Sequence, residues 1–178
     1  MIATDTQAAC LGAILFTDLV GFTEFNDAVG DARAFEVLDL QAALAGQAIA
    51  SVPGARVVKE LGDGLMIWID TADAGLSCAL ELMRSVERAR ATGDLPLGVR
   101  MGMHHGEALP RGDDLVGQTI NIGARVADLA GPGELLVSEA LVANCGDVHA
   151  ATTLRPVGPV FVKGVQDPIW LHRVVDPA

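Results

Sequence analysis

The chain has 178 residues, and its 23 acidic residues against 12 basic ones give a net charge of −11 at pH 7. A chain of this length with 51% hydrophobic residues is predicted to fold as one domain, residues 1–178, with a flexible terminus at residues 1–9. Its acidity argues against broad binding to nucleic acid or to an anionic membrane. A phosphate-bearing ligand would need metal ions or a few well-placed cations.

Three cysteines, Cys10, Cys78 and Cys145, are far apart and form no CxxC motif. An odd number with this spacing favours reduced thiols and a cytoplasmic location. The apolar run at residues 8–16 is too short to span a bilayer, and no basic segment precedes it. We therefore expect neither a membrane segment nor a signal peptide.

Residues 13–18, AILFTD, form a continuous apolar run that ends in Asp18. Such a run is typical of a central strand covered on both faces. Gly21, Phe22 and Thr23 follow and begin a short helix, whose free amide groups attract anions. An aspartate beside such a turn is understandable if a divalent cation lies between Asp18 and a phosphate.

Two longer helices are predicted to be structural. Asp31 caps residues 32–50, and Thr71 caps residues 72–91. The apolar face expected for the first of them is Phe35, Leu38, Ala42, Ala45 and Ile49.

Residues 57–68, VVKELGDGLMIW, predict a hairpin whose Gly-Asp-Gly turn presents Asp63. Lys59 lies four residues before that aspartate. A carboxylate and an amine on a stiff hairpin make a plausible site, although an ordinary solvated hairpin tip fits this stretch equally well.

Residues 98–105 predict a strand, and residues 107–116 a loop or an extended arm. His104 and His105 would point to opposite faces of that strand, so we do not expect them to share a zinc ion. In the helix predicted for residues 117–129, Asn121 and Arg125 are four positions apart and lie on one face. An amide beside a guanidinium suits a nucleotide; the alternative is an ordinary solvated surface.

After a break at residues 132–133, the tail predicts a strand at 134–137 and a helix capped by Ser138. Short strands follow at 152–156, 160–163 and 169–174, with Lys163 at a turn. Strands and helices interleave along the whole chain. This order predicts an α/β (α+β) sandwich with helices over a mixed sheet.

Four segments together resemble the ordered signatures of class III nucleotidyl cyclase catalytic domains. They are FTDLVGFT at 16–23, KELGDG at 59–64, DLVGQTINIGAR at 114–125 and VKGV at 162–165. The resemblance extends over about residues 13–174. It implies a ferredoxin-like βαββαβ core with a mainly antiparallel sheet, followed by C-terminal strands.

The resemblance implies that Asp18, Asp63 and the carbonyl of Leu19 bind two divalent cations, Mg²⁺ or Mn²⁺. Lys59 and Asp114 match the pair that recognises the purine, in the combination that selects adenine. Guanylyl cyclases of the family typically carry glutamate and an uncharged residue at these two positions.

Asn121 matches the residue that orients the ribose, and Arg125 the one that stabilises charge at the α-phosphate. The triphosphate-binding positions are Gly21, Phe22, Thr23 and Lys163. The implied enzyme is an adenylate cyclase that binds ATP and acts as a head-to-tail homodimer with sites at the interface. The alternatives are a guanylyl or dual-specificity cyclase and a catalytically silent nucleotide-binding dimerisation module.

Overall fold

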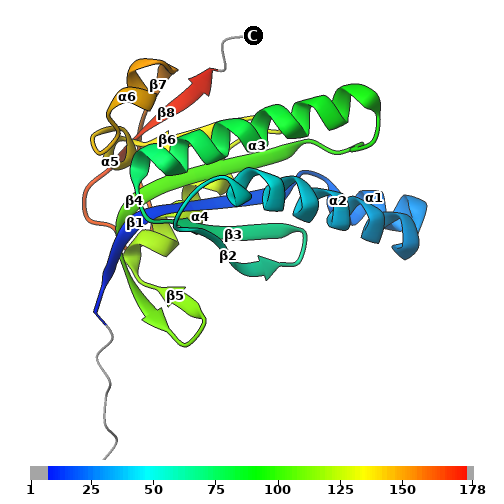
Figure 1. Ribbon diagram of the computed structural model, residues 1–178, viewed down its shortest axis with the longest axis horizontal. Helices are drawn as coiled ribbons and strands as arrows, with labels where there is room; N and C mark the ends of the chain where they lie inside the picture. Colours follow the sequence, from blue (N-terminus) through cyan, green and yellow to red (C-terminus); the bar gives the residue numbers. More distant parts are fainter. Residues whose placement is uncertain (1–7, 176–178) are drawn as a thin grey trace, which may run out of the picture.

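The computed structural model describes residues 8–175, except the side chains of Asp147 and His149. Its centre is an eight-stranded sheet in the order β2-β3-β1-β4-β6-β8-β7, with β5 paired to β4 (Figure 1). Neighbouring strands are antiparallel except β4 and β6. The strands are β1 (Cys10–Leu19), β2 (Ala55–Leu61), β3 (Gly64–Ile69), β4 (Val99–Arg111), β5 (Asp114–Val116), β6 (Leu135–Ser138), β7 (Thr153–Val160) and β8 (Ile169–Val175). The helices are α1 (Phe22–Val29), α2 (Asp31–Ala50), α3 (Ala72–Thr92), α4 (Gln118–Leu129), α5 (Glu139–Val142) and α6 (Asp147–Ala150).

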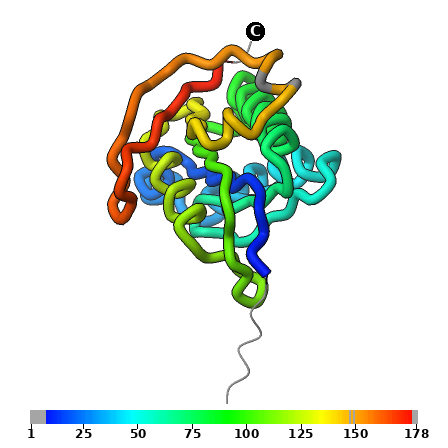
Figure 2. The backbone as a smooth tube through the Cα atoms, turned by 90° about the vertical axis from the view of Figure 1, so that its left-hand side faces the viewer, coloured from blue at the N-terminus to red at the C-terminus, as the bar shows by residue number. Residues whose placement is uncertain are grey.

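Helices cover both faces of this sheet. Helices α2 and α3 lie on one face, and α4 lies on the other (Figures 1 and 2). The elements from β1 to β4 follow one another as β-α-α-β-β-α-β, and their strands lie in the order β2-β3-β1-β4. With α1 and α2 taken together as the first helical connection, this is the βαββαβ arrangement. The predicted fold, a ferredoxin-like core with additional C-terminal strands, is therefore confirmed.

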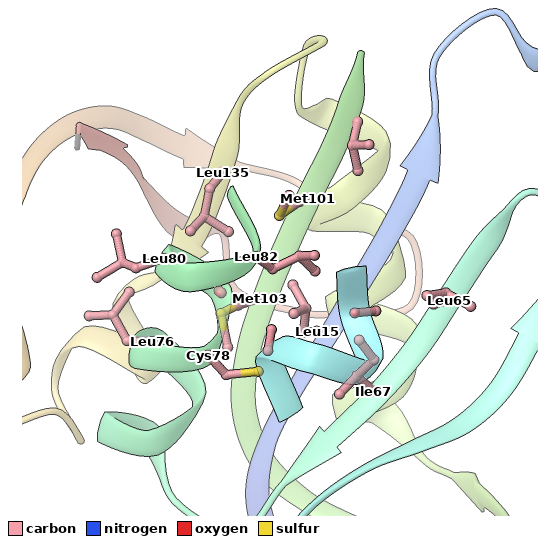
Figure 3. Packing of buried hydrophobic residues seen from close by; sticks show 14 of the residues in the cluster. Leu15, Leu65, Ile67, Leu76, Cys78, Leu80, Leu82, Met101, Met103 and Leu135 are labelled. Atoms are coloured by element: carbon pink, nitrogen blue, oxygen red, sulfur yellow. The ribbon is translucent and has the colours of Figure 1, made fainter. Parts of the chain in front are cut away.

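Strand β1 is buried on both faces, as its continuous apolar run predicted. Leu15 packs toward α2 and α3, whereas Ile14 and Phe16 belong to the cluster beneath α4. Figure 3 shows Leu15 close to Met103 of β4 in the larger of the two cores. Strand β1, whose last two residues are Asp18 and Leu19, is thus packed on both sides.

The buried face of α2 differs from the prediction. Phe35 is 64% exposed, and Ala42 is also exposed. The alanine-rich helix offers two apolar faces with the same three- and four-residue spacing, so periodicity could not choose between them. The face that is buried contains Gln41, whose amide donates a hydrogen bond to Thr17 Oγ1 at 3.2 Å. It consists of Ala34, Val37, Gln41, Ala45 and Ala48.

The predicted helix caps are partly confirmed. Thr71 Oγ1 accepts a hydrogen bond from the amide of Ala74 at 3.3 Å, and Ser138 Oγ accepts one from Leu141 at 3.3 Å. Asp31, expected to cap α2, is instead its first residue, and Gly30 occupies the cap position. The helix after Ser138 ends at Val142.

The tail prediction of separate strands at 152–156 and 160–163 was wrong. One strand, β7, runs from Thr153 to Val160, and no strand covers residues 161–168. Pro156 and Pro159 do not interrupt β7, because it is the edge strand and a bulge near Pro156 absorbs the irregularity.

The structure also defines the arm after β4 and the start of β1. Strand β4 extends to Arg111 and forms a hairpin with β5, so the extended arm predicted at 107–116 is confirmed. At the other end of the chain, β1 begins at Cys10, and residues 1–7 of the predicted flexible terminus lie outside the described residues. Across residues 8–175, no helix has the length and apolar character that crossing a membrane requires.

Candidate active site

Two carboxylates meet where β1 ends beside β3. Asp18 is the direct cross-strand partner of Gly64, the residue that follows Asp63. A Cβ atom at Gly64 would lie 2.6 Å from the carbonyl oxygen of Thr17 and 3.5 Å from Asp18 Oδ1. Only glycine lets the two strands approach this closely, and the close approach brings the turn with Asp63 next to Asp18.

The negative charge of Asp18 affects the ionisation of Asp63. Burial, and then the negative charge of Asp18, raise the pKa of Asp63 above its usual value. Two neighbouring carboxylates repel each other when both are ionised. A divalent cation between them would remove that repulsion.

Arg100 binds one oxygen of Asp18. It is the cross-strand partner of Asp18 in β4, and its Nε and Nη2 atoms lie 2.7 Å and 2.6 Å from Asp18 Oδ2. The other oxygen, Oδ1, lies on the side of Gly64. Sequence reasoning missed Arg100; its signal was a lone basic residue within an apolar strand, GVRMGM, but its partner could not be named without the strand register.

The donor atoms at this end of the sheet fit magnesium or manganese. The carboxylates of Asp18 and Asp63 and the carbonyl of Leu19 are oxygen ligands of the kind these ions prefer. No group of three or more His, Cys, Asp or Glu that could hold a metal occurs in the described part of the chain. A bound ion would therefore complete its shell with substrate phosphate oxygens and water, as Mg²⁺ commonly does.

His104 of β4 is buried in the core and hydrogen-bonded to Ser138. His104 is 8% exposed, and its Nδ1 atom lies 2.8 Å from Ser138 Oγ. Burial, with a smaller contribution from His105, lowers the pKa of His104 to about 4. His104 is therefore a neutral, hydrogen-bonded core residue at physiological pH.

The predicted anion-binding turn directly follows β1. Gly21 precedes α1 with a φ of 79°, a conformation that favours glycine. The amides of Phe22 and Thr23 are in the first turn of α1, where amide groups have no acceptor within the helix. Phosphate binding here stays a prediction.

The two residues expected to recognise the purine form an ion pair. Lys59 Nζ in β2 lies 2.7 Å from Asp114 Oδ2 in β5. The amide of Leu115 also donates to Asp114, at 2.8 Å. The hydrogen bond from Lys59, followed by that from Leu115, lowers the pKa of Asp114. The arm formed by β4 and β5 thus delivers Asp114 to the hairpin that carries Lys59.

Helix α4 presents Asn121 and Arg125 on its exposed side, while Ile122 and Val126 are buried. Leu129 is 53% exposed. It is the last residue of the helix, where the chain leaves the sheet surface.

Asp128 connects α4 with the end of the sheet where Asp18 lies. Arg125 Nη1 lies 3.1 Å from Asp128 Oδ2, and Arg100 Nη1 donates to the carbonyl oxygen of Asp128 at 3.3 Å. A chain of contacts therefore joins Arg125 to Asp18 through Asp128 and Arg100. Asp128 was not singled out from the sequence either.

Lys163 makes no hydrogen bond or ion pair with the other predicted site residues. It is exposed in the turn at residues 163–164, and it makes no hydrogen bond or ion pair with another described residue. One chain therefore brings together the carboxylates Asp18 and Asp63, pairs Lys59 with Asp114 and exposes one face of α4, while Lys163 contacts none of these residues.

Comparisons with known proteins identify the family. The family model for the adenylate and guanylate cyclase catalytic domain matches residues 6–174. A pH-sensitive adenylate cyclase of Mycobacterium tuberculosis is 30% identical over 164 residues, which are 90% of this chain and 40% of that protein. An adenylate cyclase of Glutamicibacter nicotianae is 33% identical over 155 residues, 87% of this chain and 37% of that protein.

The fold has close structural counterparts as well. The crystal structure of the adenylyl cyclase CyaB from P. aeruginosa aligns with a TM-score of 0.84 at 21% identity, covering 96% of each chain. This chain spans less than half the length of the two curated relatives. The family match nevertheless covers almost the whole of it, and the chain belongs to the family of adenylate and guanylate cyclase catalytic domains.

Proposed function

We propose that this domain converts ATP into 3′,5′-cyclic AMP and pyrophosphate. The observation that carries the proposal is the ion pair between Lys59 and Asp114, 2.7 Å apart. It gives a cyclase-family domain one hydrogen-bond donor and one acceptor at the positions that recognise the base. The names of the curated relatives point the same way.

The pair selects adenine by its hydrogen-bonding pattern. Asp114 accepts from the exocyclic N6 amine of adenine, and Lys59 donates to its N1. Guanine presents the opposite pattern, a carbonyl at C6 and an N1–H group. A site built for one pattern leaves polar groups unpaired with the other, so the other base binds more weakly.

Two divalent cations, Mg²⁺ or Mn²⁺, are proposed to bind at each site through Asp18, Asp63 and the carbonyl of Leu19. When bound, the cations lower the pKa of the ribose 3′-hydroxyl and neutralise charge on the leaving pyrophosphate. Asp18 can offer Oδ1 to a cation while Oδ2 stays with Arg100, because the Nε and Nη2 atoms of Arg100 both lie on Oδ2.

The remaining polar groups hold the substrate. Asn121 orients the ribose, and the guanidinium of Arg125 stabilises the charge that grows at the α-phosphate as the 3′-oxygen attacks. The amides of Gly21, Phe22 and Thr23, with Lys163, bind the triphosphate. Arg100, with a side chain 30% exposed beside Asp18, is placed to add a further phosphate contact.

We propose a head-to-tail homodimer, in which each site takes Asp18 and Asp63 from one subunit and the purine pair, Asn121, Arg125 and Lys163 from the other. Large apolar side chains flank these residues. Leu129, near Arg125, is 53% exposed, and Phe161, near Lys163, is 83% exposed. Exposed apolar groups around polar site residues are typical of an interface. The three free thiols and an intracellular substrate favour a cytoplasmic location.

The test is a turnover assay. Concentrated protein is given ATP or GTP with Mn²⁺ or Mg²⁺, and the cyclic products are separated, with Asp18→Asn as the metal-site control. Cyclic AMP well above cyclic GMP, abolished in the control, supports the proposal. Dominant cyclic GMP would overturn the assignment of Lys59 and Asp114. Nucleotide binding by a dimer without any product would identify a catalytically silent module instead.

A further inference from the structure

Asp128 lies between two arginines that have different partners. Its Oδ2 atom is 3.1 Å from Arg125 Nη1, and its Oδ1 atom is 3.8 Å from Arg100 Nη2. Its carbonyl oxygen also accepts a hydrogen bond from Arg100 at 3.3 Å. One carboxylate on the last turn of α4 is thus shared by a residue of its own helix and a residue of β4.

Arg100 is in turn shared by two carboxylates. Its Nη2 atom lies 2.6 Å from Asp18 Oδ2 and 3.8 Å from Asp128 Oδ1. Shortening the longer distance to that of an ordinary ion pair requires a movement of about 1 Å. A shift of this size would bring the guanidinium from Asp18 toward Asp128, and the charges around it would decide how far it moves.

We propose that Asp128 is a positioning residue that couples Arg125 to the metal-binding carboxylate Asp18 of the same chain. The inference rests on the proposed function, in which Arg125 and Asp18 of one chain serve different sites of the homodimer. Asp128 then links the two sites through a single subunit, over the contacts Arg125–Asp128–Arg100–Asp18.

The direction of the coupling follows from the charges. While Arg125 pairs with Asp128, it neutralises that carboxylate, and Arg100 stays on Asp18. When a phosphate draws Arg125 away, Asp128 attracts Arg100, and Asp18 becomes freer to bind a cation. Nucleotide at one site therefore favours metal at the other, and by linkage metal at the second site favours nucleotide at the first.

The experiment measures Mn²⁺ binding without nucleotide, by the loss of the free-ion electron paramagnetic resonance signal. Four proteins are compared: wild type, Arg125→Ala, Asp128→Asn and the double variant. Removing Arg125 imitates its withdrawal by phosphate, so Arg125→Ala should bind Mn²⁺ about twofold more tightly than wild type, the scale of one exposed helical ion pair. With Asn at position 128, the same substitution should leave Mn²⁺ affinity unchanged.

A matched pair on α2 supplies the control. Arg33 and Glu36 form another exposed ion pair whose residues are also three positions apart on one helix. Arg33 Nη1 lies 2.6 Å from Glu36 Oε2. Arg33→Ala and Glu36→Gln should not change Mn²⁺ affinity. Circular dichroism and thermal unfolding establish that each variant is folded; side chains of Arg125 and Asp128 are 60% and 51% exposed, so both positions tolerate replacement.

Two outcomes would overturn the inference. If Arg125→Ala changes Mn²⁺ affinity equally with Asp or Asn at position 128, the arginine acts through its long-range field alone. If Arg125→Ala does not change Mn²⁺ affinity in the wild-type background, the contacts from Arg125 to Asp18 do not couple the two residues. Failure of the wild-type protein to bind Mn²⁺ at all would be a different result, because it contradicts the proposed metal site itself.

Discussion

The ammonium group of Lys59 lies 2.7 Å from the carboxylate of Asp114, although the residues are 55 positions apart and belong to β2 and β5. Their side chains are 50% and 35% exposed. An exposed ion pair of this kind contributes little to stability, because water screens the attraction. An incoming purine can therefore replace the direct contact with hydrogen bonds to both groups, while the pair keeps them in place in the free protein.

Exchanging this pair should exchange the nucleotide. In Lys59→Glu/Asp114→Ser, position 59 accepts where it used to donate, which fits the N1–H group of guanine. We expect the ratio of kcat/KM for ATP over GTP to fall by at least about 100-fold, because two hydrogen-bond preferences are reversed. Product analysis with both nucleotides measures the ratio.

Lys59→Glu alone is the informative intermediate. It places two carboxylates side by side at a site where the native residues attract, so activity with both nucleotides should fall. An unchanged preference for ATP in the double variant would show that the base is recognised elsewhere.

Mixing two inactive variants should restore activity if the sites are shared. Asp18→Ala removes a metal ligand, and Arg125→Ala removes the transition-state arginine. A heterodimer of the two chains has one site with both defects and one intact site. Random pairing in a 1:1 mixture should give about a quarter of wild-type activity, because half of the dimers then carry one good site of two.

The control for this experiment carries both substitutions in one chain. The Asp18→Ala/Arg125→Ala chain mixed with wild type leaves every heterodimer with one defect in each site, so only wild-type homodimers are active. No recovery in the first mixture, with dimers present by light scattering, would mean that each chain builds its site alone.

The fold could be predicted largely from local patterns, because strand β1 and the hairpin β2–β3 have strong and unambiguous signals. The prediction failed where two patterns fit one stretch. In α2, alanines at both candidate faces concealed that Phe35 is exposed and that Gln41 is buried. In the tail, two short strands were expected where β7 is one strand, because an edge strand can contain prolines.

The site was predictable where its residues lie in contiguous motifs. Asp18 and Asp63 were expected to lie together, and the strand register of β1 and β3 brings them together. Arg100 and Asp128 were missed, because their importance depends on partners that are 82 and 28 positions away from Arg100 in the chain. Such contacts follow from strand pairing and helix placement, which no local pattern specifies.

Gly64 is predicted to be essential for the metal half-site. Gly64→Ala places a methyl group 2.6 Å from the carbonyl oxygen of Thr17, so β3 must move away from β1 near Asp18. We expect a loss of about 1–3 kcal/mol in the free energy of unfolding and weaker Mn²⁺ binding. Urea unfolding and Mn²⁺ titration measure the two effects.

Gly46 in α2 gives the matched control, since a Cβ atom there meets no atom within 4 Å. Gly46→Ala should raise stability by up to about 1 kcal/mol and leave Mn²⁺ binding unchanged. Equal Mn²⁺ affinity in the two alanine variants would show that the spacing of β1 and β3 does not control the site.

Acid should destabilise the domain through His104. Its folded pKa of about 4 lies below the value of 6.5 for a solvated histidine. Between these values the unfolded chain binds more protons than the folded one, so this contribution to stability is complete above pH 6.5 and declines as the pH falls toward 4. From pH 7 to pH 5 the decline should be about 2 kcal/mol. His104→Gln, which keeps a polar group beside Ser138, should show a smaller decline by that amount in urea unfolding at the two pH values. If both proteins lose stability equally, other groups control the acid response, and His104 is protonated in the folded chain without penalty.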